Sequence, residues 1–555
     1  MQALDQIQEI LPAKKGANCA LFLDKLFAFR YIFTMTKSAR EIELKLELDP
    51  AAQDEIKRSG ALKDFAASRP VTKTLQSIYF DTPDQALRQA KISLRVRKSG
   101  RSWVQTAKLG TGVMGGLSSP IEAEHPVSGR ALDLSVIEDA DVRAKLVETI
   151  GDASVSECFE TVMKRTTRQL TRETDGAHIE LAFDTGNILA GPESHPLVEL
   201  EMELKAGPSA ALFEVAKQLL NDVPFRFSPY SKAERGYRFA EGQPDGKAVP
   251  FFAENVVFEQ GITVEHAFRD VLRSCLTQIA ENRLAVLASE NPEGPHQLRV
   301  GLRRLRSAFR LFKPALNPAT MTPLDQLART VAAEAGALRD FDVLIDEIVE
   351  PVVDKAPESI SFEALLADLH ASRGKDTRTA LVTHLKSAEV NAFLLDQAAY
   401  TEGRGWLDPE NFDQSSLLAQ PIEDFAAQAL AKQWKKVNKY GKRLDELTIP
   451  ERHEMRKAMK KLRYGIEFFG SLYPKDAVKP LLKRMKRLQD IFGYLNDVAM
   501  AERLPEMSNV TGKNALTAGQ AIGFTIGWHE AQSQAMWQHA RGYWDATKDV
   551  PKFWS

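Results

Sequence analysis

The stretch Glu41-Ile42-Glu43-Leu44-Lys45-Leu46-Glu47-Leu48 decides how the first half of this 555-residue chain folds. Charged and aliphatic residues alternate along it without a break, and successive side chains of a β-strand point to opposite faces. Glu41, Glu43, Lys45 and Glu47 therefore share one face, and four aliphatic side chains share the other. Taken alone, such alternation is typical of an edge strand whose charged face meets water.

The alternation recurs along the chain, and this recurrence favours a different interpretation. Further alternating stretches occupy residues 77–80, 92–97, 104–109, 178–183 and 198–205. Charged residues in or near these stretches are Arg95 and Arg97, Glu122 and Glu124, Glu199, Glu201 and Glu203, and the isolated cations Lys108, Arg165 and Lys232. Strands of this kind can close into a barrel with the charged faces inside and helices outside.

A barrel lined in this way needs a ligand of matching charge. Like charges buried side by side are costly unless a group of opposite sign lies between them. A triphosphate with divalent cations meets this need, because Arg and Lys bind phosphate oxygens and paired carboxylates bind hard cations.

The ordered set of motifs resembles the CYTH, or triphosphate tunnel, superfamily over residues 37–240. Glu41-x-Glu43-x-Lys45 resembles its opening motif, and the later matches are Tyr79-Phe80-Asp81-Thr82-Pro83, Leu94-Arg95-Val96-Arg97, Thr106-Ala107-Lys108, Asp184-Thr185-Gly186 and Ser231-Lys232-x-x-Arg235-Gly236. The chain departs from the family at Gly116-Leu117-Ser118-Ser119-Pro120, where members often carry an arginine.

The resemblance implies an eight-stranded antiparallel β-tunnel that binds triphosphate with Mg²⁺ or Mn²⁺. The implied metal ligands are Glu41, Glu43, Glu199, Glu201 and Glu203. The implied catalytic residues are Glu41, Glu43, Lys45, Arg95, Arg97, Lys108, Arg165 and Lys232. The implied substrate contacts are Lys45, Arg95, Arg97, Lys108, Glu122, Glu124, Arg165, Lys232 and Arg235. Turn capping is the favoured role of Asp81 and an alternative role for Asp184.

Beyond residue 255 the pattern changes to long amphipathic helices, with breaks near residues 317–323, 351–357 and 403–409. A single offset of 157 residues relates His296 to His453, Phe268 to Phe425, Gly336 to Gly493, Leu338 to Leu495 and Asp340 to Asp497. We therefore predict a tandem duplication that forms an all-α bundle of two pseudo-symmetric units.

Each of the two units carries a stripe of basic residues at intervals of three or four. The stripes comprise His296, Arg299, Arg303, Arg306 and Arg310 in the first unit, and His453, Arg456, Lys460 and Arg463 in the second. Such spacing places each set on one helix face, where like charges repel unless acidic neighbours or a ligand offset them. We expect the stripes to face each other and to bind a linear polyanion.

The first stripe also carries a family resemblance. His296-Gln297-x-Arg299-Val300-x-x-Arg303-Arg304-Leu305-Arg306 resembles the opening helix of the CHAD domain, and the resemblance covers residues 256–505. It implies binding of inorganic polyphosphate by the two stripes. His296 and His453 have no chelating spacing, so we expect phosphate contact or helix packing from them and no metal binding.

Composition narrows the classes of partner and location. With 73 Lys and Arg against 75 Asp and Glu, the net charge disfavours nucleic acid as a partner. No apolar run is long enough to cross a membrane, and no segment has the features of a signal peptide. Three widely spaced cysteines form no disulfide framework, which predicts a cytoplasmic location. The oligomeric state is left open.

The predicted fold class is a multidomain α+β protein. We expect an N-terminal extension over residues 1–36, explained by an over-long start ahead of Met35, and a tunnel domain over residues 37–240. A linker over residues 241–255 leads to the helical domain over residues 256–505. A helical tail with four tryptophans completes the chain over residues 506–555 and is predicted to dock on the body.

The leading hypothesis is metal-dependent hydrolysis of inorganic tripolyphosphate to pyrophosphate and phosphate, with polyphosphate bound by the helical domain. One alternative keeps the tunnel but changes its substrate to thiamine triphosphate or a nucleoside triphosphate, or its reaction to adenylyl cyclase chemistry. Another is a polyphosphate-binding protein without turnover. No aromatic clamp or base-reading motif is visible in residues 37–240, which favours the inorganic substrate.

Overall fold

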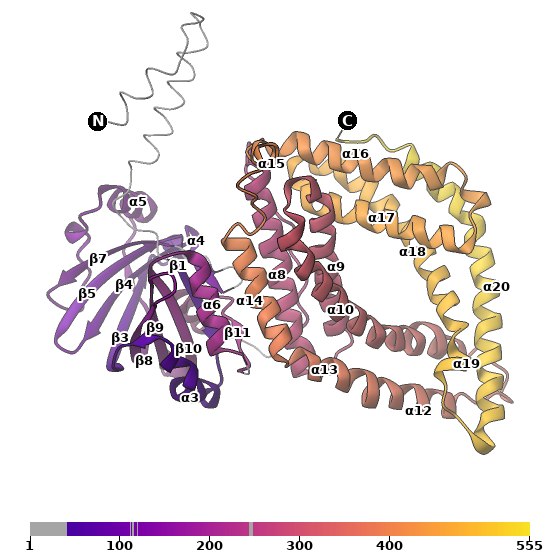
Figure 1. The fold of residues 1–555 in the computed structure, drawn as a ribbon, viewed down its shortest axis with the longest axis horizontal. Helices are drawn as coiled ribbons and strands as arrows, with labels where there is room; N and C mark the ends of the chain where they lie inside the picture. The colour runs from indigo at the N-terminus through magenta and orange to yellow at the C-terminus, as the bar shows by residue number, and fades with distance from the viewer. Residues whose placement is uncertain are drawn as a thin grey trace, which may run out of the picture.

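The computed structural model describes residues 42–110, 113, 116–118, 120–221, 223–243 and 248–554. A curled β-sheet forms the N-terminal part and a helical region the C-terminal part, and the two lie side by side (Figure 1). Glu41, the expected extension over residues 1–36 and the alternative start at Met35 lie outside the described residues. No helix among the described residues is long and apolar enough to span a membrane.

The predicted eight-stranded antiparallel sheet is confirmed in its long strands. Eight strands of six or more residues are described: β1 (Ile42–Glu47), β3 (Val71–Asp81), β4 (Ile92–Ser99), β5 (Ser102–Leu109), β7 (Ile121–Val127), β8 (Ser156–Arg172), β9 (Ala177–Ala190) and β10 (Glu193–Ala206). Two-residue strands are β2 (Ala66–Ala67), β6 (Leu117–Ser118) and β11 (Arg226–Phe227). The strand order is β11-β1-β10-β9-β8-β3-β4-β5-β7.

The sheet encloses its inner face because the chain before β7 reaches back to the first strand. In β6, Leu117 pairs with Leu44 of β1, and the Lys45 N–H donates to the Gly116 carbonyl at 2.7 Å. Gly116 has a φ of +79°, and a Cβ there would lie 2.9 Å from the Lys45 carbonyl oxygen. Glycine is therefore the residue that permits this close approach.

Strand β1 turns the alternation of the sequence into two chemically different faces. Leu44 and Leu46 are fully buried on the outer face, in one core with residues of α3 (Pro50–Arg58) and α6 (Ser209–Leu219). Burying each leucine contributes about 1.5–3 kcal/mol. Glu43 and Lys45 lie on the inner face, as the alternation predicts.

The C-terminal region is all-α, which confirms the expected fold class. Its main helices are α8 (Val264–Ala288), α9 (Glu293–Leu311), α10 (Pro318–Asp342), α12 (Glu363–Ser372), α13 (Thr379–Leu385), α14 (Ala388–Glu402), α15 (Phe412–Leu418), α16 (Ile422–Gly441), α17 (Ile449–Phe469), α18 (Lys475–Ala501) and α20 (Ala515–Lys548). In α20, Trp544 is buried and stacks on Trp434 of α16 with ring centroids 5.7 Å apart.

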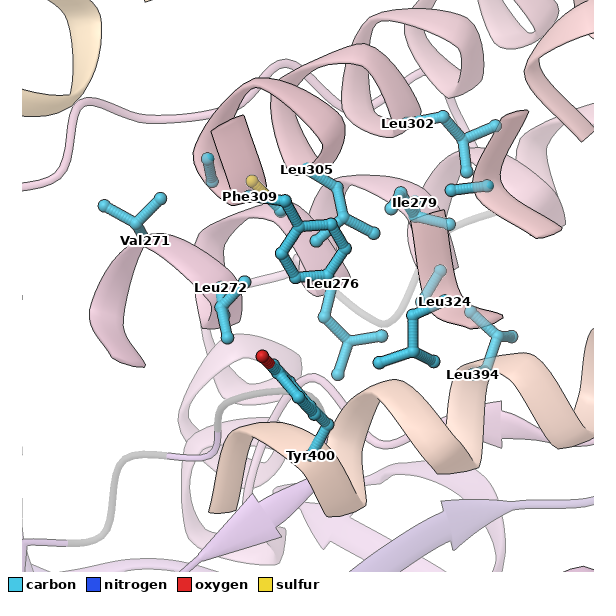
Figure 2. Packing of buried hydrophobic residues seen from close by; sticks show 14 of the residues in the cluster. Val271, Leu272, Leu276, Ile279, Leu302, Leu305, Phe309, Leu324, Leu394 and Tyr400 are labelled. Atoms are coloured by element: carbon cyan, nitrogen blue, oxygen red, sulfur yellow. The ribbon is translucent and has the colours of Figure 1, made fainter. Parts of the chain in front are cut away.

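Figure 2 shows the core of the helical region where α8, α9 and α14 meet. Phe309 and Leu305 from α9 point toward Leu276 of α8, and Leu394 and Tyr400 of α14 approach from the opposite side. The same hydrophobic cluster continues without a break into the outer face of the β-sheet. The two regions therefore share one core.

Polar contacts also join the two regions. The buried side-chain amide of Asn391 in α14 donates to the carbonyls of Leu220 at 3.3 Å and Val223 at 3.2 Å, just after α6. Arg283 of α8 donates to the Asn391 Oδ1 atom at 2.6 Å. Arg226 of β11 pairs with a carboxylate of α8 at 2.7 Å. These contacts fix the helical region against the strands next to β1.

Candidate functional site

The inner face of the curled sheet lines a cavity of about 240 Å³. The charged side chains around it are Lys45, Arg95, Arg97, Lys108, Arg165, Lys205 and Lys232 with Glu43, Glu122, Glu124, Glu180, Glu201 and Glu203. Most of the tunnel residues predicted from the sequence are in this set. Of the others, Glu199 is buried behind the cavity wall and Glu41 lies outside the described residues.

Arg235 is the predicted substrate contact that the fold places elsewhere. It is buried, pairs with Glu47 and donates to the Ser228 hydroxyl at 3.1 Å, and it does not line the cavity. Arg235 lies three residues after Lys232 on the same helix, so its side chain starts about 4.5 Å farther along the helix axis.

Strand register explains why charges that are distant in the sequence meet. Antiparallel pairing sets Lys45 opposite Glu201, Glu43 opposite Glu203, and Glu203 opposite Glu180. A neighbouring row runs from Glu199 through Asp184 to Arg165. Directly opposite residues in an antiparallel pair have Cβ atoms about 4.5–5.5 Å apart, which is close enough for ion pairing.

Three buried carboxylates, those of Asp184, Glu199 and Glu201, form a compact group with oxygens within 4.8 Å of one another. The Lys232 Nζ atom lies 2.9 Å from Asp184 and 2.6 Å from Glu201, and it also pairs with Glu199. Lys45 lies 3.0 Å from Glu201, so this carboxylate is shared by two lysines. The group therefore carries its own counter-ions.

The ion pairs outweigh the effect of burial on the pKa values of Lys232 and Glu201, but not on that of Glu199. Burial lowers the pKa of Lys232, but the carboxylates of Glu199, Glu201 and Asp184 more than reverse this and hold it well above its ordinary value. Burial raises the pKa of Glu201, and Lys232 and Lys45 together bring it well below the usual range. For Glu199, burial and the neighbouring Glu201 keep the pKa raised in spite of Lys232.

The chemistry of the carboxylate group fits a divalent cation. Carboxylate oxygens are the ligands that Mg²⁺ and Mn²⁺ prefer. Among the described residues, the buried Glu199 Oε1 atom has no hydrogen-bond partner, so one ligand atom is already available. Asp184, Glu199 and Glu201 would hold the ion. Glu43 and Glu203, which were also predicted as ligands from the sequence, lie outside this compact group. Glu43 pairs with Lys45 at 2.5 Å, and Glu203 pairs with Lys205 at 2.5 Å.

Asp184 is the ligand candidate that the sequence argument did not assign. It lies inside β9 rather than in a turn, so its turn-capping alternative is wrong. Its burial is complete, and Arg165 pairs with it at 2.6 Å. Asp184 lies opposite Glu199 in the pairing of β9 with β10. The separate sequence motifs do not reveal this register.

The opposite wall of the cavity has a surplus of positive charge. Arg95 lies 3.7 Å from Glu122, and the same carboxylate pairs with Lys108 at 2.7 Å. No carboxylate in the described part of the chain lies within 4 Å of the Arg97 guanidinium, which donates to a serine hydroxyl at 3.1 Å. Burial, together with repulsion from Arg95 and Arg165, lowers the pKa of Arg97 to about 10. An anion in the cavity would relieve this repulsion.

Tyr79 is a cavity residue whose role the sequence motif left unassigned. Its ring stacks on Phe159 with centroids 4.6 Å apart. Burial raises the pKa of the Tyr79 hydroxyl, but Arg95 and Arg97 outweigh burial and lower it. Where the family often carries an arginine, Ser118 lines the cavity here.

Helix α7 (Lys232–Ala240) delivers Lys232 to the carboxylates from its first turn. A Cβ at Gly236 would lie 1.9 Å from the Phe159 ring, so glycine lets α7 pack closely on the sheet. Asp81 accepts hydrogen bonds from three backbone N–H groups before and within α4 (Ala86–Gln89), which confirms its turn-capping role. It also accepts one from the Tyr237 hydroxyl at 2.8 Å, which ties α7 to this turn.

In the helical region, the structure brings the centres of the two basic stripes together. Lys460 of α17 is repelled by Arg299 and Arg303 of α9 as well as by Arg456. Burial and this repulsion lower the pKa of Lys460 to about 6. At the 157-residue offset the packing is equivalent, because Arg299 lies over Gly336 and Arg456 over Gly493.

The outer parts of the stripes differ from their centres. Arg306 pairs with an aspartate of α10 at 2.9 Å, Arg463 with a glutamate of α17 at 3.2 Å, and His453 contacts an asparagine at 3.0 Å. Burial and the neighbouring Arg339 lower the pKa of His296 to about 4, so it is neutral at pH 7. Burial and repulsion from Arg306 lower the pKa of Arg310. The greatest surplus of positive charge therefore lies at the centre.

Comparisons with known proteins find two families in this chain. The family model of the CYTH domain matches residues 39–237, and that of the CHAD domain matches residues 270–505. A Haemophilus influenzae protein described as an inorganic triphosphatase is 31% identical over 205 residues. The match covers 37% of this chain and 56% of the relative, so the chain spans little more than half of that protein's length.

Two solved structures are also similar to parts of the chain. The crystal structure of the CHAD domain from the plant Ricinus communis is 28% identical, covers 55% of this chain and 99% of that chain, and has a TM-score of 0.46. A Hippeastrum protein, described as a putative adenylyl cyclase with a dominant triphosphatase activity, is 22% identical. That match covers 37% of this chain and 96% of that chain, with a TM-score of 0.28.

Proposed function

Since residues 39–237 form a CYTH domain and residues 270–505 a CHAD domain, we propose that the chain hydrolyses inorganic tripolyphosphate to pyrophosphate and phosphate. The observation that carries this proposal is the division of charge across the cavity. One wall holds the buried group of Asp184, Glu199 and Glu201, and the other holds Arg95 and Arg97. The Haemophilus influenzae relative, described as an inorganic triphosphatase, supports the same class of reaction.

The residues of the positive wall bind and orient the anion. Arg97 gains the counter-charge that it lacks in the described fold, and Arg95 and Lys108 contact phosphate oxygens beside it. A bound Mg²⁺ or Mn²⁺ ion supplies neutralisation of the charge on the transferring phosphoryl group. Lys45 and Lys232 stay protonated beside the carboxylates, where they add positive charge close to the phosphate chain.

The size and lining of the cavity favour an inorganic substrate over an organic triphosphate. A volume of about 240 Å³ is below the roughly 300 Å³ at which pockets for drug-sized ligands begin. Tyr79 is the one aromatic side chain among the described residues that line the cavity, and it already stacks on Phe159. A nucleoside or thiamine group would therefore project out of the cavity without an aromatic partner.

Phosphate release from tripolyphosphate, ATP and thiamine triphosphate tests this proposal when the three are measured in parallel. Each is assayed with Mg²⁺ or Mn²⁺ and with an EDTA control. We expect metal-dependent release with a strong preference for tripolyphosphate. A preference for either organic triphosphate, or formation of cyclic AMP from ATP, would show that the substrate is organic and would contradict the proposal. Release from none of the three would leave a protein that binds phosphate chains without turnover.

For the helical region we propose binding of long-chain inorganic polyphosphate between α9 and α17. The supporting observation is that Arg299, Arg303, Arg456 and Lys460 lie close enough to repel one another. A bound polyanion would offset the repulsion among these cations. Binding of fluorescently labelled polyphosphate is measured against DNA as a competitor, and we expect DNA of equal phosphate content to compete weakly.

A further inference from the structure

Tyr464 lies in α17 between the two basic stripes, and its hydroxyl lacks a partner. The residue is 2% exposed, and its hydroxyl has no hydrogen-bond partner among the residues that the structure describes. Buried hydroxyl groups in folded proteins are nearly always paired, because an unpaired one loses its water contacts and gains nothing in return. The position of this hydroxyl therefore needs an explanation.

The surroundings of Tyr464 contain further donors that lack acceptors. The Nε–H groups of Arg303 and Arg456 are also buried and unpartnered within the described part of the chain. The Arg463 guanidinium lies 5.4 Å from the Tyr464 ring centroid, and Arg299 and Arg456 both interact electrostatically with its hydroxyl. The unpartnered groups are all donors.

The acidic residues near this cluster do not supply the missing acceptor. Asp340 contacts Arg299 at 3.6 Å, and Glu467 contacts Arg463 at 3.2 Å, but neither carboxylate is hydrogen-bonded to Tyr464. Asp497 of α18 interacts with Arg456 of α17 and also leaves the hydroxyl unpaired. A ligand with several anionic oxygens would satisfy the donors and the positive charge together.

The duplication makes Tyr464 unique to the second unit. Its counterpart at the 157-residue offset is Ser307, whose hydroxyl donates to the Arg303 carbonyl at 2.8 Å and is therefore satisfied. The pseudo-symmetric pair of helices thus offers one unpaired hydroxyl between two basic faces. This asymmetry defines a single hydroxyl contact point between the two basic faces.

We propose that the Tyr464 hydroxyl donates a hydrogen bond to a non-bridging oxygen of a phosphate chain held between α9 and α17. The inference rests on the polyphosphate binding proposed above and adds a residue that the basic stripes do not contain. Arginine and lysine attract any polyanion, whereas a fixed hydroxyl selects for an acceptor oxygen at one place. An inorganic phosphate chain presents such oxygens on every phosphorus, with no sugar between them.

The substitution Tyr464→Phe tests this inference because it removes one oxygen atom and no charge. We expect the affinity for long-chain polyphosphate to fall about tenfold at fixed salt, as for loss of a hydrogen bond to a charged group. The dependence of binding on salt concentration should not change, because the number of cations is the same. The melting temperature without ligand should be equal or higher, since an unpaired buried hydroxyl has been removed.

Tyr400→Phe is the matched control. Tyr400 in α14 is also buried with an unpartnered hydroxyl, but it packs in the apolar core shown in Figure 2. This variant should behave like Tyr464→Phe in thermal stability and like the wild-type protein in polyphosphate affinity. Equal affinity of the wild-type protein and Tyr464→Phe, or equal losses in the two variants, would overturn the inference. Failure of the wild-type protein to bind polyphosphate would instead overturn the proposed function of the helical region.

Discussion

Two lysines in the two halves of this chain, the buried Lys232 and the half-buried Lys460, have pKa values shifted in opposite directions. Burial lowers the pKa of Lys232 in the β-sheet cavity, but three carboxylates raise it well above its ordinary value. Burial lowers the pKa of Lys460 in the helical region, and repulsion from the surrounding arginines lowers it further, to about 6. The difference lies in whether the fold supplies the counter-ion.

This contrast indicates two kinds of anion site. Around the carboxylate group of the cavity, cations and carboxylates already neutralise each other, so an anion is favoured there when a metal ion arrives with it. Between α9 and α17 the surplus charge is positive, so an anion is favoured by itself. We therefore expect metal-dependent chemistry in the first site and metal-independent, salt-sensitive binding in the second.

The largest expected effect comes from Lys232→Met. The substitution leaves Asp184, Glu199 and Glu201 buried without their shared counter-ion. Loss of one partner from a buried ion pair costs about 3–5 kcal/mol of unfolding free energy. Turnover of tripolyphosphate should fall to background because the carboxylates repel the substrate. Chemical denaturation and phosphate release measure the two effects.

Lys145→Met on α5 (Ala140–Ile150) is the matched control, because Lys145 is half-exposed and pairs with one surface glutamate. It should change stability by less than about 0.5 kcal/mol. A Lys232→Met protein as stable as the control would show that the carboxylates are not held charged in the fold. The cavity would then not carry its own counter-ions, and the contrast with the helical region would disappear.

The sequence was sufficient where one strand or one helix carries the whole pattern. Alternation in β1 predicts that Glu43 and Lys45 face inward, and the helical spacing predicts that Arg299 and Arg303 share one face. These features depend on the local periods of strand and helix, which the residues themselves determine.

The sequence was insufficient where function depends on register or on packing between elements. Asp184 joins the carboxylate group because β9 pairs with β10 in one register, and its own neighbours in sequence resemble a turn. Arg235 follows Lys232 in one motif, yet the turn of α7 directs it to Glu47. Strand β8 was not predicted as a unit, since its threonines lie on both faces and blur the alternation. Tyr464 carries no charge and so is absent from a search for basic stripes.

The second prediction separates the two sites by reversing charge in one of them. Arg303→Glu combined with Lys460→Glu places two carboxylates at the centre of the basic stripes. Long-chain polyphosphate binding should fall by about 100-fold at low salt, and its salt dependence should become shallower. Hydrolysis of tripolyphosphate in the cavity should be retained. Fluorescence anisotropy and phosphate release give the two readouts on the same preparation.

An equal loss of binding and hydrolysis in the double variant would contradict this division of labour. Exchange of two exposed lysines of α16, Lys432→Glu with Lys435→Glu, is the control for the change in net charge. It should weaken binding far less than the change at the centre of the stripes. Equal weakening would mean that net charge alone governs binding.

The third prediction concerns pH and has a smaller effect. A bound anion stabilises the protonated form of Lys460. Because the pKa of Lys460 is lowered in the protein without ligand, binding of the anion is accompanied by uptake of a proton. Affinity for long-chain polyphosphate should therefore rise as pH falls from 9 toward about 6, by no more than about tenfold per pH unit. Calorimetry in buffers of different ionisation enthalpy measures the proton uptake.

Lys460→Met should make binding much less dependent on pH, because the group that takes up the proton is removed. The cavity provides the comparison, because Lys45 and Lys232 have raised pKa values and stay protonated over the same range. Unchanged pH dependence in Lys460→Met would assign the proton uptake to another group.

The smallest expected effect comes from Lys460→Met. It is also the sharpest test of the comparison, because the same substitution is made at Lys232 in the other half of the chain. Lys460→Met should stabilise the protein without ligand by about 1 kcal/mol, since it removes a half-buried cation that neighbouring arginines of α9 and α17 repel. Lys232→Met should destabilise it. The folded pKa of Lys460 is about 6 and lies below the ordinary 10.5, so its unfavourable contribution is complete below pH 6. That contribution is lost as pH rises toward 10.5. The gain from Lys460→Met should therefore be larger at pH 6 than at pH 9, and a loss of stability at either pH would show that the helical region does hold a counter-ion for Lys460.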